Sequence, residues 1–153
     1  MTQGEREGDL LLRYKMSFVG INKAGIDEVG KGSLFGPVFA GAVILSKSSA
    51  MNLIKEGLKD SKKLTPKFRQ YLVPLIKKKS ISWGIGQSSA LEIDTLGIRI
   101  ATELAMIRAI QKLKKKPKLI IVDGNLSIRL WKGNQISLTK GEDKSPAIAA
   151  ASV

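Results

Sequence analysis

The stretch from Ala24 to Leu45 (AGIDEVGKGSLFGPVFAGAVIL) restricts the fold more than any other part of the chain. Two adjacent carboxylates, Asp27 and Glu28, follow a short apolar segment and precede a glycine-rich turn and a continuous apolar run. This order predicts a strand, a turn and a second strand. Glycine lets a ligand approach the main chain, so the turn can offer a polyanion the amides of Gly30, Lys31 and Gly32.

The adjacent carboxylates of Asp27 and Glu28 allow two interpretations. Like charges this close repel unless something positive lies between them, which favours a bound divalent cation. Alternatively, Asp27 caps the end of the strand and Glu28 is only solvated, as most surface carboxylates are. The rest of the chain has to decide between these interpretations.

The composition limits the chemistry of any site. The 153 residues are 43% hydrophobic, which is enough for one domain with a real core. The absence of cysteine excludes disulfides and is compatible with a reducing intracellular setting. Because histidine is also absent, imidazole bases and histidine-bound zinc are excluded. A metal would have to be held by oxygen, which favours Mg²⁺ or Mn²⁺.

The charge is strongly positive, with a small acidic focus. The chain has 26 Lys and Arg against 13 Asp and Glu, a net charge of +13, which indicates a polyanionic partner. Five of the acids fall in three glycine-flanked segments that we expect to converge: Asp27, Glu28, Asp123, Glu142 and Asp143. This combination is typical of a nucleic-acid enzyme, in which cations hold phosphates and carboxylates hold a metal. A basic binding protein of the ribosomal type would explain the charge but not the acidic focus.

The two ends of the chain lead to separate expectations. Residues 1–16 are predicted to form a poorly ordered tail without a signal-peptide pattern, and no apolar run approaches the roughly 20 residues of a membrane span. Residues 17–153 are predicted to form one domain. The apolar end at Val153 follows a helix that starts near Pro146 and is too short to be stable alone. The expectation is that the natural domain continues beyond this chain.

Helices and strands alternate through the middle of the chain. Helices are expected over 51–57, 66–79, 88–97 and 98–114, strands over 81–87 and 119–122, and a hairpin-like excursion over 127–138. The helix over 98–114 has an apolar stripe made of Ile100, Leu104, Ile107, Ile110 and Leu113. A helix before a buried strand implies a crossover and a parallel neighbour. Asp123 then lies at the carboxyl end of a strand, where ligands gather, although an aspartate there can also simply form a turn.

Four segments, GIDEVGKGSLFGPVFAGAV, LKDSKKLTP, LIIVDGN and KGEDKSPAIAAASV, resemble ribonuclease HII in the same order and at comparable spacing. The resemblance implies an α/β ribonuclease H-like fold with a mixed central sheet flanked by helices. It also implies endonucleolytic hydrolysis of the RNA strand in RNA/DNA hybrids and at ribonucleotides embedded in duplex DNA, giving 3′-hydroxyl and 5′-phosphate ends. A cytoplasmic monomer without a membrane partner is expected, lacking the family's C-terminal helical segment.

The resemblance also implies roles for single residues. Asp27, Glu28 and Asp123 look like metal-binding acids for two Mg²⁺ or Mn²⁺ ions, and Glu142 takes the place where the family has an aspartate. Asp143 is a possible substitute. The turn of Gly30, Lys31 and Gly32 resembles the family's Gly-Arg-Gly loop, which reads the ribose 2′-hydroxyl. The nucleic-acid backbone would be held by Asp60, Ser61, Lys62 and Lys63.

Two rival functions use the same residues. A non-catalytic nucleic-acid-binding domain, or an inactive truncated remnant of the enzyme, would keep the carboxylates without a completed site. A phosphate-binding metabolic enzyme could use the glycine loop, but neither a Walker motif nor a dinucleotide pattern supports it.

Overall fold

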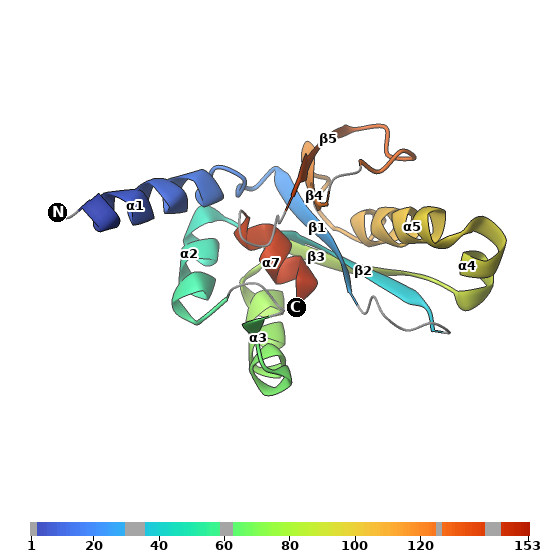
Figure 1. Ribbon diagram of the computed structural model, residues 1–153, viewed down its shortest axis with the longest axis horizontal. Coiled ribbons are helices and arrows are strands. Elements are labelled where there is room, and N and C mark those ends of the chain that lie inside the picture. The colour runs from blue at the N-terminus through green and yellow to red at the C-terminus, as the bar shows by residue number, and fades with distance from the viewer. Residues whose placement is uncertain (1–2, 30–35, 59–62, 125–126, 140–144) are drawn as a thin grey trace.

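A five-stranded sheet forms the centre of the computed structural model, which describes residues 3–29, 36–58, 63–124, 127–139 and 145–153 (Figure 1). Its strands are β1 (Lys23–Val29), β2 (Val38–Ile44), β3 (Ser82–Ser88), β4 (Leu119–Asp123) and β5 (Asn134–Leu138). The helices are α1 (Gln3–Met16), α2 (Lys47–Lys55), α3 (Pro66–Lys79), α4 (Ala90–Leu96), α5 (Ile98–Gln111) and α7 (Pro146–Ser152). The described helices include none with the length and apolar character that crossing a membrane requires.

The sheet is mixed, with the strand order β3-β2-β1-β4-β5. Strands β1, β2 and β3 form an antiparallel meander. Strand β4 then pairs parallel to β1, and β5 parallel to β4. The predicted crossover is therefore confirmed, because α5 carries the chain back so that β4 can run beside β1 in the same direction.

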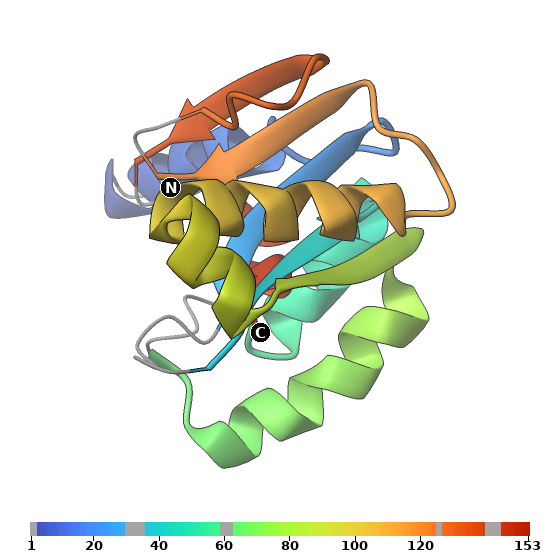
Figure 2. The ribbon, with the colours of Figure 1, turned by 90° about the vertical axis from the view of Figure 1, so that its right-hand side faces the viewer.

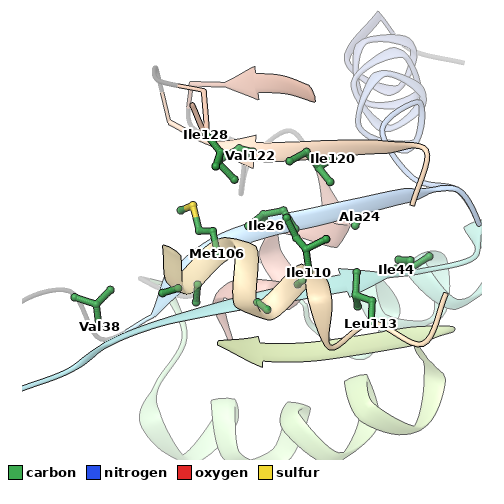
Figure 3. Packing of buried hydrophobic residues seen from close by; sticks show 14 residues of the cluster. Ala24, Ile26, Val38, Ile44, Met106, Ile110, Leu113, Ile120, Val122 and Ile128 are labelled. Carbon is green, nitrogen blue, oxygen red and sulfur yellow. The ribbon is translucent and has the colours of Figure 1, made fainter. Parts of the chain in front are cut away.

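Helix α5 covers one face of the sheet (Figure 2). Alternate residues of β1 and β4, among them Ile26 and Val122, point toward this helix and pack with Met106 and Ile110 (Figure 3). Sheet and helix thus share one core. This arrangement fixes which residues of β1 and β4 must point to the opposite face.

The opposite face carries α7, with α2 and α3 beside it. Gly25 and Gly41 let α7 approach closely, because a Cβ at Gly25 would overlap the backbone of Ala147 and Ile148, and one at Gly41 the carbonyl of Ala151. The start of α7 therefore lies over β1, and its end over β2. Figure 1 shows α7 on the near side of these strands.

The buried side of α5 differs from the predicted apolar stripe. Ile100, Leu104 and Ile107 are only half-buried, whereas the helix buries Ala101, Ala105 and Ala109. Glycines on β3 explain the difference, since Gly84 and Gly86 face the backbone of α5 at distances that leave no room for larger side chains. Because α5 packs this close to β3, only small side chains fit between the helix and the sheet.

Two further segments differ from the description expected for them. Gln3–Met16, within the segment expected as a poorly ordered tail, is helical (α1), and its Leu10, Leu11 and Tyr14 are exposed. The segment over 127–138 does not form a hairpin: its second half is β5, which extends the sheet as a parallel edge strand. The helices predicted over 66–79 and from Pro146 are confirmed, with Thr65 and Ser145 as N-caps.

Candidate active site

Two of the predicted acids lie side by side at the carboxyl ends of neighbouring parallel strands. The register pairs Ile26 of β1 with Val122 of β4, and each is followed directly by an aspartate, Asp27 and Asp123. Neighbouring strands are about 4.8 Å apart. The fold therefore brings together two carboxylates that are 96 positions apart (123 − 27) in the sequence.

Both aspartates belong to the α7 face. Residues alternate along a strand, so Asp27 shares a face with Gly25, which contacts α7, and Asp123 shares a face with Ile121, which packs against Ile148 of α7. Asp27 is 6% exposed. Its Oδ1 accepts a hydrogen bond from the Glu28 amide at 2.8 Å, which orients the carboxylate along the strand end.

Glu28 follows Asp27 within β1 and so alternates to the α5 face of the sheet. It is partly exposed there, beyond the core residue Ile26. The described backbone therefore brings Asp27 and Asp123 together, and places Glu28 on the other face of the sheet at the same strand end. A metal-binding role for Glu28 stays a prediction.

Residues 140–144, including the candidates Glu142 and Asp143, lie outside the described residues. Leu138, shortly before this segment, is the register partner of Asp123, and Ser145, directly after it, is the buried N-cap of α7. The choice between Glu142 and Asp143 therefore stays a prediction.

The predicted nucleic-acid contacts are described only in part. Gly30, Lys31 and Gly32 lie outside the described residues, as do Asp60, Ser61 and Lys62. Lys63 is described and lies just before Thr65, whose Oγ1 accepts the Phe68 amide at 3.1 Å and so caps α3. Lys63, Thr65 and Phe68 line a shallow hollow of about 380 Å³.

The oxygen-only donors of the aspartate pair fit a hard divalent cation such as Mg²⁺ or Mn²⁺. Within the described ranges no three acidic side chains gather closely enough to form a metal-binding group, so the pair needs further ligands. A second hollow, of about 250 Å³, lies over β2 and β3 between α3 and the end of α7. Its lining, which includes Phe39, Trp83 and Ile85, is almost entirely apolar and lacks such ligands.

Glu103, a buried carboxylate on α5, is not among the residues predicted from the sequence. It is 6% exposed and holds Arg129 in the connection between β4 and β5, with Arg129 Nη2 at 2.9 Å from Oε2. Burial opposes the charged form, but the hydrogen bonds from Arg129 outweigh it and lower the pKa of Glu103. The only signal in the sequence is that Glu103 lies among alanines on the buried side of a helix. This signal can be used only when the buried face of the helix has been predicted correctly.

Comparisons with known proteins identify the family. The family model for ribonuclease HII matches residues 24–153. A ribonuclease HII from Prochlorococcus marinus is 63% identical over 130 residues, which cover 85% of this chain and 68% of the relative. Another from Parasynechococcus marenigrum is 59% identical, with coverage of 85% and 58%. The chain thus spans about three fifths to two thirds of the length of these relatives.

Solved structures show the same fold. The ribonuclease H2 from Pyrococcus horikoshii OT3 superposes with a TM-score of 0.72 at 25% identity, covering 84% of this chain and 67% of that one. Bst-RNase HIII in complex with Mn²⁺ gives a TM-score of 0.73 at 19% identity, covering 90% and 51%. The family model and the identity to these relatives show that the chain belongs to the ribonuclease HII family.

Proposed function

We propose that this chain hydrolyses the RNA strand of RNA/DNA hybrids and cleaves at ribonucleotides embedded in duplex DNA, leaving 3′-hydroxyl and 5′-phosphate ends. Its family is one of metal-dependent endoribonucleases, and the activity of this chain is the proposal. We expect it to act as a cytoplasmic monomer.

The observation that supports this proposal most directly is the aspartate pair on the α7 face. Asp27 and Asp123 end two neighbouring parallel strands of a protein whose net charge is +13. Two carboxylates held this close repel each other, and a divalent cation relieves that repulsion. The surrounding positive charge attracts the phosphates of the substrate.

In this proposal each acid is assigned a position. Asp27 and Asp123 hold the cation from the sheet, and Glu142, with Asp143 as its possible substitute, approaches from the segment before α7. Glu28 would contribute from the end of β1. When bound, two divalent ions lower the pKa of the attacking water and stabilise the leaving 3′-oxygen. The protein fixes the geometry of these acids by pairing β1 with β4.

The basic and glycine-rich segments would select the substrate. The 2′-hydroxyl is the group that distinguishes RNA from DNA along the backbone, and the amides of the turn Gly30 to Gly32 are proposed to read it. Asp60, Ser61, Lys62 and Lys63 are proposed to hold the backbone, with the lysines neutralising phosphates. These contacts position the strand so that its scissile phosphate meets the acids.

Substituting Asp27 with Asn tests the proposal. The change keeps the shape of the side chain but removes the charge that holds the cation, so cleavage of duplex DNA bearing one ribonucleotide should fall by more than about 100-fold in Mg²⁺ or Mn²⁺. Hybrid binding, measured by fluorescence anisotropy in EDTA, should be unchanged. Asp94→Asn is the matched control, because Asp94 is exposed on α4, which packs against α5, whereas Asp27 and Asp123 belong to the α7 face of the sheet.

Two results would contradict the proposal. Full cleavage by Asp27→Asn would show that the aspartate pair does not hold the reactive cation. Tight hybrid binding by the unaltered chain without cleavage at any Mg²⁺ or Mn²⁺ concentration would instead favour the non-catalytic nucleic-acid-binding domain.

A further inference from the structure

The described part of the connection between β4 and β5, residues 127–133, is held by hydrogen bonds from two neighbouring elements. From β5, the side chain of Gln135 binds the backbone of Ile128 twice: Oε1 accepts its amide at 2.7 Å, and Nε2 donates to its carbonyl at 2.9 Å. From α5, Glu103 accepts hydrogen bonds from the backbone amide and the guanidinium of Arg129. Ile128, 1% exposed, is buried between these anchors near Val122 (Figure 3).

Among the described residues, the ion pair between Glu103 and Arg129 is the only one that holds this connection. Its side chain is 7% exposed, whereas that of Arg129 is 52% exposed, so the carboxylate is the buried member of the pair. Arg129 Nε and Nη2 lie 3.2 and 2.9 Å from Glu103 Oε2. A charged hydrogen-bonded pair with one buried member holds its geometry more firmly than an exposed pair does.

Arg129 lies only six residues after Asp123 in the sequence (129 − 123). Gly124 turns the chain with a φ of 120° and donates its amide to Leu138 at 3.0 Å, so Asp123 lies between the β4 ladder and a left-handed turn. Arg129 follows five residues after that turn. Without the contact between Glu103 and Arg129, the end of β4 could lose its pairing, and the Asp123 carboxylate would move relative to Asp27.

We propose that Glu103 is a positioning residue for the acidic site: by holding Arg129 it fixes the connection after Asp123, and so sets the affinity of the aspartate pair for a divalent cation. The inference rests on the proposed function of that pair. Glu103 is buried and is not one of the acids predicted from the sequence. In this inference it affects cation binding without contacting the cation.

The test measures Mn²⁺ binding directly, by the loss of the free Mn²⁺ signal in electron paramagnetic resonance, with hydrogen exchange of the Arg129 amide alongside. Glu103→Ala removes the acceptor and the charge, and should raise the Mn²⁺ dissociation constant on the order of tenfold and expose the Arg129 amide to exchange. Glu103→Gln keeps an acceptor, so it should recover part of the affinity. Circular dichroism confirms that each variant is folded.

The matched control is Glu92→Ala. Glu92 also pairs with an arginine of α5, with Arg108 Nη2 at 2.6 Å, but it lies on α4 and does not touch the connection. The Mn²⁺ dissociation constant of Glu92→Ala should stay within about twofold of that of the unaltered chain, well below the effect expected for a residue that supports a metal ligand. An equal loss in both variants would show a general loss of stability and overturn the inference.

Failure of this inference can be told from failure of the proposed function. If Glu103→Ala exposes the Arg129 amide but binds Mn²⁺ like the unaltered chain, the pair is only structural and the inference is wrong, while a loss of binding in Asp27→Asn still supports the aspartate pair. If Asp27→Asn binds Mn²⁺ as well as the unaltered chain does, the proposed function itself fails.

Discussion

The carboxylates of this protein are held in different ways, and the difference follows from their surroundings. Asp27 is buried at a strand end beside Asp123, where the fold brings two acids together. Glu103 is buried too, but beside Arg129. Glu92 is near the surface and completes a capping box with Ser89 while pairing with Arg108. An acid placed next to another acid favours a cation site, whereas an acid placed next to an arginine is typical of a structural ion pair.

Glu92 gives a prediction for the pH dependence of stability. Hydrogen bonds from Arg108, and then from the Ser89 amide, lower its pKa from 4.5 to about 2. Because the folded pKa lies below the unfolded one, this stabilisation is present above pH 4.5 and is lost as the pH falls toward 2. Glu92→Gln should therefore lower the urea midpoint modestly at pH 7 and hardly at all near pH 2, since exposed pairs contribute little.

A background variant isolates the pair. With Arg108→Gln already present, the Glu92→Gln change should lose most of its pH-dependent effect, because the hydrogen bonds from Arg108 that contribute most to the lowered pKa of Glu92 are gone. A pH-independent difference between the two variants would show that the capping box, and not the ion pair, accounts for the stabilisation.

At the scale of elements, helices lie unusually close to the sheet because the strands contribute glycine at the contacts. Gly84 and Gly86 face α5, and Gly25 and Gly41 face α7. The sequence shows these glycines but not which helix each one meets, since that depends on pairing between strands far apart in the chain. Close approach also explains why α5 buries alanines and leaves its longer side chains half-buried.

Gly25→Ala tests this close approach. The added methyl would overlap the backbone of Ala147 and Ile148, and neither can move without shifting α7, so we expect a loss of about 1–3 kcal/mol in the free energy of unfolding. Cleavage should fall as well, because Gly25 lies two residues before Asp27 on the same face. Gly8→Ala is the control: nothing lies near its Cβ on α1, and alanine favours a helix by about 1 kcal/mol. Urea unfolding distinguishes the two, and an unchanged Gly25→Ala would mean that α7 does not rest on β1 as described.

The sequence predicted local features better than long-range ones. The starts of α3 and α7 were predicted because Pro66 and Pro146 each mark a first helical turn within a few residues of sequence. The parallel placement of β4, and with it the approach of Asp123 to Asp27, followed from the order of helix and strand. The edge strand β5 was missed, because it depends on pairing register and strand length rather than on composition.

At the scale of the whole molecule, positive charge also lies at the end of the sheet opposite the acidic pair. The connection between α5 and β4 carries the exposed Lys114, Lys116 and Lys118, and it joins β4 at Leu119. Asp123 is at the other end of that strand, about 13 Å away at the usual rise per residue. Charge at the Leu119 end can attract a nucleic acid, but it is badly placed to contact the phosphates next to the aspartates.

This separation predicts two different salt dependences. If Lys63 contacts a phosphate as proposed, Lys63→Gln should reduce the slope of log Kd against log salt by about one, because one fewer counterion is released on binding. Lys114→Gln with Lys116→Gln removes twice the charge but should change the slope by less, since those side chains lie at the far end of β4. Fluorescence anisotropy with an RNA/DNA hybrid in EDTA, over a range of KCl concentrations, measures both slopes without cleavage. A larger change from the Lys114 and Lys116 pair would place the nucleic acid along the α5 to β4 connection, and would separate the main binding surface from the aspartates.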